Sequence, residues 1–61
     1  MPIIFVNMVE GRTVDEKREL TKGITEASVK ALKVKPTDVR VIINNIAKED
    51  FANAGILKCD Q

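Results

Sequence analysis

The sequence predicts an α/β (α+β) fold, in which two parallel strands flank one helix as a βαβ unit and a short C-terminal hairpin or arm follows. Apolar, β-branched runs at residues 2–9 and 39–46 predict the strands, and a helical pattern from Thr13 to about Lys33 lies between them. Strands joined by a crossover helix pair in parallel. A chain of 61 residues is expected to form a single domain, residues 1–61.

The first strand and the start of the helix have clear local signals. Residues 2–9, PIIFVNMV, end at Glu10-Gly11, which is typical of a strand followed by a turn. Thr13 and Glu16 have the spacing of a capping box, and Asp15 adds negative charge to the first helical turn. The helix is therefore expected to begin at Thr13.

An apolar stripe along this helix is expected to cover the sheet. Its members recur at spacings of three and four residues: Leu20, Ile24, Ala27 and Ala31, widened by Val29 and Leu32. Four basic side chains are expected to face water: Lys17, Arg18, Lys22 and Lys30. Gly23 lowers helix stability by about 1 kcal/mol relative to Ala, which a close packing contact would explain.

The remaining segments follow from their breakers and apolar runs. Residues 35–38, KPTD, end the helix, and residues 39–46, VRVIINNI, form the second strand. Residues 47–61 contain Gly55 and the apolar pair Ile56-Leu57. We interpret this last segment as a loop with a small hairpin or arm.

Both faces of the expected sheet are apolar. In the first strand, alternation places Ile3, Phe5 and Val9 on one face and Ile4, Val6 and Met8 on the other. In the second strand, Val39, Val41 and Ile43 share one face, opposite Arg40, Ile42, Asn44 and Ile46. One helix covers only one face, so the second face is expected to meet another subunit. The sequence therefore predicts a homo-oligomer.

Composition narrows the classes of function. The net charge is +1 with both signs interspersed, and Phe5 and Phe51 are the only aromatic residues, so neither nucleic acid nor a membrane is expected as a partner. No signal peptide or transmembrane pattern is present, and we expect a cytoplasmic protein. Cys59 is the single cysteine and there is no histidine, so neither a disulfide framework nor a common zinc site is expected.

The lack of histidine directs attention to the amino terminus. An α-amino group titrates near neutrality, with an unperturbed pKa of about 7.7–8.0. Removal of Met1 would leave Pro2 as a secondary amine at the start of a strand, where nearby cations or an apolar pocket would lower its pKa. Met-Pro is also a common beginning without chemical meaning, and this residue alone favours that interpretation.

Two arginines and a phenylalanine are further candidates for a site. Arg12 follows the first strand, and Arg40 interrupts an apolar strand, where a charge is out of pattern. Two guanidinium groups could bind the two ends of a dicarboxylate. For Arg40 the alternative is an ion pair with an acid such as Asp38 or Glu49 at an interface. For Phe51, which could line an apolar pocket, the alternative is a place in the core.

Together these residues resemble the 4-oxalocrotonate tautomerase family over the whole chain. The motifs that carry the resemblance are Met1-Pro2-Ile3, VEGR at residues 9–12, DEK at 15–17, VRVII at 39–43, and Ala47-Lys48 followed by Phe51. Each motif is weak alone. Their joint spacing from an amino-terminal proline in a chain of this length is specific.

The resemblance implies a tautomerase (isomerase) that needs no cofactor or metal. Pro2 would act as the general base on a small carboxylate substrate such as 2-hydroxymuconate, a reaction of aromatic compound degradation. By position, Arg40 would bind the carboxylate and oxygen at the reacting end, Arg12 the distant carboxylate as an electron sink, and Phe51 would keep the pocket apolar. The implied assembly is a homohexamer, a trimer of dimers, with sheets flanked by helices and sites at subunit contacts.

Two features affect these implications. Where the family commonly has a glycine-rich stretch, residues 52–55 read Ala-Asn-Ala-Gly, which bears on the hairpin and the size of the assembly. With Met1 retained, the Pro2 nitrogen would be an amide and no base. One alternative is a hydratase, dehalogenase or decarboxylase of the same superfamily, with Glu10, Asp38 or Glu49 activating water where hydration requires it. The other is a non-catalytic, ligand-binding oligomer.

Overall fold

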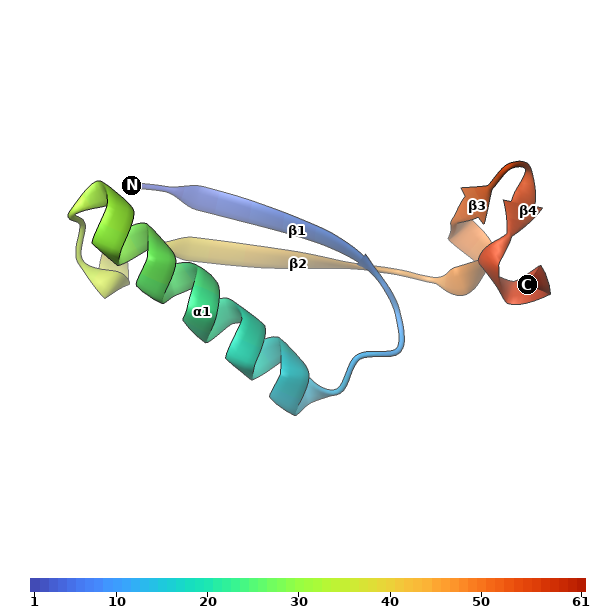
Figure 1. Cartoon of the computed structure of the whole chain (residues 1–61), viewed down its shortest axis with the longest axis horizontal. Coiled ribbons are helices and arrows are strands. Elements are labelled where there is room, and N and C mark those ends of the chain that lie inside the picture. Colours follow the sequence, from blue (N-terminus) through green and yellow to red (C-terminus); the bar gives the residue numbers. More distant parts are fainter.

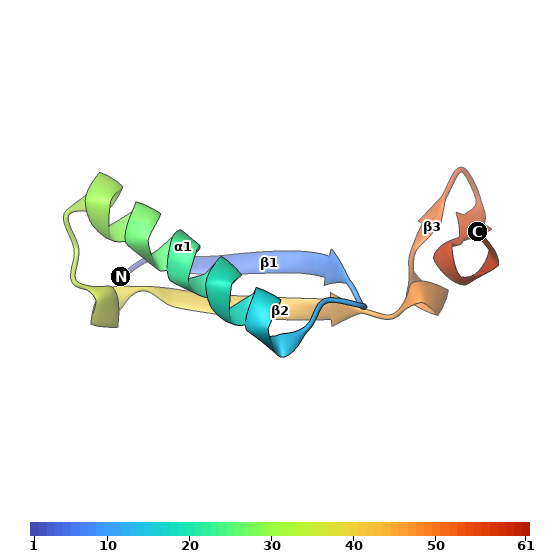
Figure 2. The same ribbon diagram turned by 60° about the horizontal axis from the view of Figure 1, so that its bottom comes forward.

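The computed structural model describes residues 1–61 and confirms the predicted βαβ unit (Figure 1). Strand β1 spans Ile3–Val9, helix α1 spans Val14–Leu32, and strand β2 spans Arg40–Ile46. The two strands pair in parallel along their whole length, with Ile3 opposite Arg40 and Val9 opposite Ile46. Helix α1 lies against one face of this two-stranded sheet (Figure 2).

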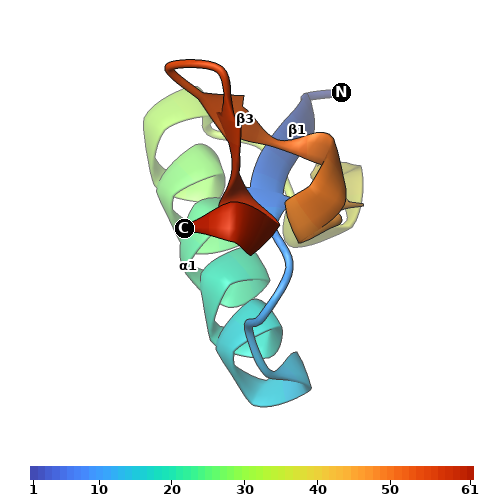
Figure 3. The same cartoon turned by 90° about the vertical axis from the view of Figure 1, so that its right-hand side faces the viewer.

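The C-terminal arm, residues 47–61, contains the predicted hairpin. Strands β3 (Ala52–Asn53) and β4 (Ile56–Leu57) pair antiparallel. The arm projects past the end of β2, away from the chain's amino terminus, which gives the molecule an elongated shape of 43 × 22 × 13 Å (Figure 1). Figure 3 looks along the long axis, with the arm nearest the viewer. Short 3-10 turns complete the chain at Pro36–Asp38, Lys48–Asp50 and Lys58–Asp60.

The predicted capping box sets the start of α1. The Glu16 N–H donates to Thr13 Oγ1 at 3.1 Å, and the Thr13 N–H donates to Glu16 Oε1 at 2.9 Å. At the other end Lys33 adopts a left-handed conformation, and its N–H donates to the Val29 carbonyl. None of the helices combines the length and the apolar character that crossing a membrane requires.

The helix packs on the sheet through a more polar stripe than predicted. Its half-buried positions are Lys17, Thr21, Ile24, Thr25, Ser28 and Val29. The expectation was thus correct for Ile24 and Val29 and wrong for four residues that are exposed in the single chain: Leu20, Ala27, Ala31 and Leu32. Of the basic side chains expected to face water, Lys17 does so only in part, since it is half-buried and its Nζ lies 3.4 Å from Asn45 Oδ1 on β2 at the surface.

Back-bonding to the helix explains how hydroxyl groups can occupy this stripe. Thr21 Oγ1 donates to the Lys17 carbonyl at 3.0 Å, Thr25 Oγ1 to the Thr21 carbonyl at 2.8 Å, and Ser28 Oγ to the Ile24 carbonyl at 2.8 Å. A hydroxyl group that already has a hydrogen-bond partner loses little free energy when the sheet covers it. The close contact expected at Gly23 does not occur within the chain, because a Cβ there would meet no atom within 4 Å.

The face of the sheet opposite α1 is uncovered, as the alternation of the strands predicts. Phe5 is 62% exposed, Ile3 55% and Ile42 44%, and between the strands Asn44 Nδ2 donates to Asn7 Oδ1 at 2.9 Å. In the whole chain only Val39 is buried. A single copy therefore buries too little apolar surface for a stable small domain.

The hairpin turn carries a strained residue, Ala54. Ala54 and Gly55 both have positive φ, 55° and 80°. A two-residue turn with positive φ at both positions matches the twist of a hairpin but favours Asn or Gly at its first position. An alanine in the left-handed region costs roughly 1 kcal/mol.

We expect Ala54→Asn to stabilise the hairpin by about 1 kcal/mol, because asparagine tolerates the left-handed region better than alanine. Amide hydrogen exchange at Lys58, whose N–H donates to the Phe51 carbonyl at 2.7 Å, should slow about fivefold. Gly55→Ala should accelerate the same exchange. Unchanged exchange in Ala54→Asn would contradict the strain at this turn.

Candidate active site

The parallel register places Pro2 beside Arg40. The Arg40 N–H donates to the Pro2 carbonyl at 3.0 Å, one residue before the paired strands begin. Pro2 is half-buried, whereas Met1 is 76% exposed. The amino terminus therefore lies at the edge where β2 starts (Figure 2), and the main chain of Pro2 is fixed there by the sheet.

The Arg40 side chain carries an unneutralised charge. Its Nη1 donates to the Thr37 carbonyl at 2.5 Å, in the turn just before β2. The ion pairs of the chain are Arg12–Glu16 and Arg18–Asp15, so the alternative pairing of Arg40 with Asp38 or Glu49 does not form within one chain. An exposed guanidinium with no acidic partner can bind a carboxylate near Pro2.

Arg12 lies at the opposite end of β1 from Pro2. The strand between them has seven residues, which is about 23 Å at the usual rise. Gly11, with a φ of 124°, turns the chain toward α1, and Arg12 Nη1 meets Glu16 Oε2 at 3.3 Å. Arg12 and Glu16 line a pocket of about 250 Å³ together with Met8 and Leu20.

Phe51 belongs to the C-terminal arm and is also far from Pro2 of its own chain. It follows the turn Lys48–Asp50 after the end of β2 and is 40% exposed. The arm lies beyond the end of the sheet that is remote from the amino terminus (Figure 1). One chain thus brings together Pro2 and Arg40 but neither Arg12 nor Phe51, and a site with all four needs more than one subunit.

The acids considered for water activation have different surroundings. Glu10 Oε2 accepts the Lys48 N–H at 2.8 Å, which ties the end of β1 to the arm, and Asp38 Oδ2 accepts the Lys35 N–H at 3.3 Å. Glu49 forms no ion pair. Cys59 is exposed in the arm. These contacts give Glu10 and Asp38 structural roles.

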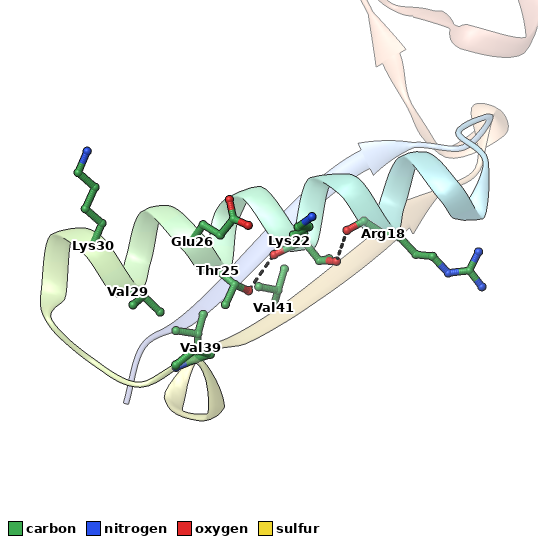
Figure 4. Close-up of a pocket in the computed structure, with 10 residues that line it drawn as sticks. Arg18, Lys22, Thr25, Glu26, Val29, Lys30, Val39 and Val41 are labelled. Atoms are coloured by element: carbon green, nitrogen blue, oxygen red, sulfur yellow. Dashed lines mark hydrogen bonds between the residues drawn. The ribbon is translucent and has the colours of Figure 1, made fainter.

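The largest hollow of the chain lies elsewhere, between α1 and β2. This groove of about 740 Å³ has Val29, Val39 and Val41 at its base and charged side chains such as Lys22 and Glu26 along the helix (Figure 4). The hydroxyl groups that reach it bond to helix carbonyls. None of the predicted site residues lines it.

The structure gives Glu16 a second contact that the sequence interpretation missed. One carboxylate oxygen closes the capping box and the other meets Arg12. The i, i+4 spacing of Arg12 and Glu16 is the signal that could have indicated this ion pair. The hydrogen bond from the Thr13 N–H lowers the pKa of Glu16 below its ordinary value of 4.5, and the Thr13 hydroxyl and Arg12 lower the pKa further.

Comparison with known proteins agrees with this architecture. The profile of the tautomerase family, described as "Tautomerase enzyme", matches residues 2–60. The chain belongs to this family. A 2-hydroxymuconate tautomerase from Pseudomonas putida is 39% identical over 57 residues, which cover 93% of this chain and 90% of that protein. The resemblance to the 4-oxalocrotonate tautomerase family is thereby confirmed.

Solved structures of tautomerases share the whole fold. A 4-oxalocrotonate tautomerase isozyme from Methylibium petroleiphilum has a TM-score of 0.88 and 46% identity, covering 95% of this chain and 91% of its own. A 4-oxalocrotonate tautomerase homologue has a TM-score of 0.95 and 33% identity, and the match covers 100% of this chain and 97% of that one. A heterohexamer 4-oxalocrotonate tautomerase from Chloroflexus aurantiacus has a TM-score of 0.89 and 28% identity, and the match covers 98% of this chain and 97% of that one. Oligomers thus occur among homologues of 4-oxalocrotonate tautomerase.

The lowered pKa of Glu16 predicts a pH-dependent contribution to stability. Since the folded-state pKa lies below the ordinary value, ionised Glu16 stabilises the fold above pH 4.5, and this stabilisation is lost as pH falls through the folded-state pKa. Glu16→Gln should lower the thermal midpoint at about pH 7 but much less at about pH 3. An equal effect at both pH values, measured by circular dichroism at one protein concentration, would contradict this assignment.

Proposed function

We propose that this chain is a cofactor-independent tautomerase of the 4-oxalocrotonate (2-hydroxymuconate) type. It would interconvert the enol and keto forms of small unsaturated 2-hydroxy and 2-oxo acids. The observation that carries the proposal is the position of Pro2, fixed by the sheet beside the unneutralised Arg40, in a member of the tautomerase family. The relative named as a 2-hydroxymuconate tautomerase supports the choice of substrate class.

Pro2 would be the general base once Met1 is removed. Its secondary amine takes the proton of the 2-hydroxyl group, the electron pair moves through the conjugated system, and the resulting ammonium returns the proton to a distant carbon. Arg40 would hold the carboxylate and the 2-oxygen at the reacting end.

The complete site is proposed to form between subunits of a homohexamer, a trimer of dimers. Arg12 and Phe51 would come from neighbouring copies, since each lies far from Pro2 in its own chain. The exposed Ile3, Phe5 and Ile42 supply an apolar face for such contacts. The heterohexamer of a relative supports an assembly of six.

Light scattering at micromolar concentration tests the assembly. We expect a mass six times that of the 6.8 kDa chain. Phe5→Lys, which places a charge in the uncovered face, should reduce the mass, whereas Lys30→Glu, on the exposed surface of α1, should not. A monomeric wild-type chain would refute the assembly.

Replacement of the base tests the chemistry. Intact mass should first show that Met1 is absent from the purified protein. Pro2→Ala, with Met1 also removed, should then lower kcat for ketonisation of 2-hydroxymuconate by about 10²-fold, near the lower end of a general base's contribution because a primary amine remains. An unchanged rate in this processed variant would exclude Pro2 as the base.

Arg40→Ala should lower kcat/KM for the same reaction, because Arg40 is placed at the reacting end of the substrate. Arg18→Ala is the matched control, since this arginine pairs with Asp15 on α1, away from Pro2. Product analysis by NMR separates ketonisation from hydration, dehalogenation and decarboxylation. Tight binding without turnover in the processed wild type would favour the non-catalytic alternative.

A further inference from the structure

The two arginines of the proposed site differ in their own-chain partners. Arg40 donates to a neutral carbonyl group, that of Thr37. Arg12 faces the carboxylate of Glu16 at 3.3 Å. A substrate carboxylate bound at Arg40 therefore meets an unneutralised cation, whereas one bound at Arg12 meets a cation whose charge is already partly balanced.

Glu16 is held in this position by more than its attraction to Arg12. Its Oε1 accepts the Thr13 N–H at 2.9 Å in the capping box, while Oε2 faces the guanidinium. An exposed ion pair alone is weak and mobile, but a carboxylate anchored to the backbone is not free to swing away. Glu16 thus remains beside Arg12 when an anion approaches.

From this geometry we propose that Glu16 is a specificity-determining residue, which weakens the binding of a second carboxylate at Arg12 and so reduces the advantage in affinity of dicarboxylic over monocarboxylic acids. The inference rests on the proposed function only in taking Arg12 as the group nearest the distal end of the substrate. The rest follows from the contacts of Arg12 and Glu16 in this chain.

The pocket around Arg12 also accommodates a substrate end without a second carboxylate. Met8 and Leu20 form its apolar part beside the ion pair. An apolar substrate end can contact these two side chains without disturbing Arg12 or Glu16. A carboxylate on the free edge of the Arg12 guanidinium, in contrast, would lie on the order of 6 Å from the Glu16 carboxylate, where repulsion in partly aqueous surroundings corresponds to about threefold to tenfold in affinity.

A matched pair of unreactive acids tests the inference without turnover. trans,trans-Muconate and sorbate share the same six-carbon diene, and sorbate has a methyl group in place of the second carboxylate. Calorimetric titration of the full assembly should show that Glu16→Gln tightens muconate binding about threefold to tenfold and leaves sorbate unchanged. Glutamine can still close the capping box, so the helix start is retained.

Two controls separate this effect from a general change in charge or fold. Asp15→Asn removes a carboxylate from the same helical turn, where it pairs with Arg18 and not with Arg12, and it should not change the ratio of the two dissociation constants. In an Arg12→Ala background, Glu16→Gln should lose at least half of its effect on that ratio. Light scattering and circular dichroism should show the same assembly for every variant.

Several outcomes would overturn the inference. Weaker muconate binding in Glu16→Gln would mean that Glu16 prepares Arg12 for a carboxylate instead of opposing one. An unchanged ratio of dissociation constants, an equal change in Asp15→Asn, or no binding of either acid to any variant would overturn it as well. Loss of turnover with this binding pattern intact would instead refute the proposed chemistry alone.

Discussion

The parallel pairing of β1 with β2 is the interaction on which the rest of the structure depends. Its first hydrogen bond runs from the Arg40 N–H to the Pro2 carbonyl, and its last runs from the Glu10 N–H to the Ile46 carbonyl at 2.7 Å. Because the strands run in the same direction, their starting ends share one edge. The amino terminus and Arg40 thereby meet, while Arg12 and the C-terminal arm leave from the opposite edge. The separation of the four candidate residues is a direct result of this pairing.

The same pairing leaves the single chain incomplete. One helix covers one face of a two-stranded sheet, and only Val39 becomes buried. The uncovered face, the exposed Leu20 and Leu32 on α1, and the isolated arm are apolar surfaces that a chain of this size leaves exposed only at a considerable cost. Contacts between copies would then both stabilise the folded chain and complete the proposed site.

Sequence reasoning succeeded where local rules decide the outcome. The capping box at Thr13, the break at Pro36 and the alternation of the strands fixed the elements and the two faces of the sheet. It failed for the helix stripe, because hydrophobicity counts do not show that Thr21, Thr25 and Ser28 satisfy their hydroxyl groups within the helix. The sequence marked Arg12 and Phe51 as candidates, but a pattern along one chain does not show which residues contacts between copies would bring together, so their specific roles came only from the family resemblance.

Pro2 as a proposed base differs from a catalytic side chain in having no rotamers. Its nitrogen is part of the main chain, and the hydrogen bond from Arg40 to its carbonyl holds the residue in the sheet. For the same reason the amino terminus cannot be extended without loss of the proposed base. Any affinity tag, linker or fusion partner joined to this end would convert the amine into an amide. The exposed arm at the carboxyl end carries no such restriction from the chemistry, although a place in the proposed assembly would set a steric one.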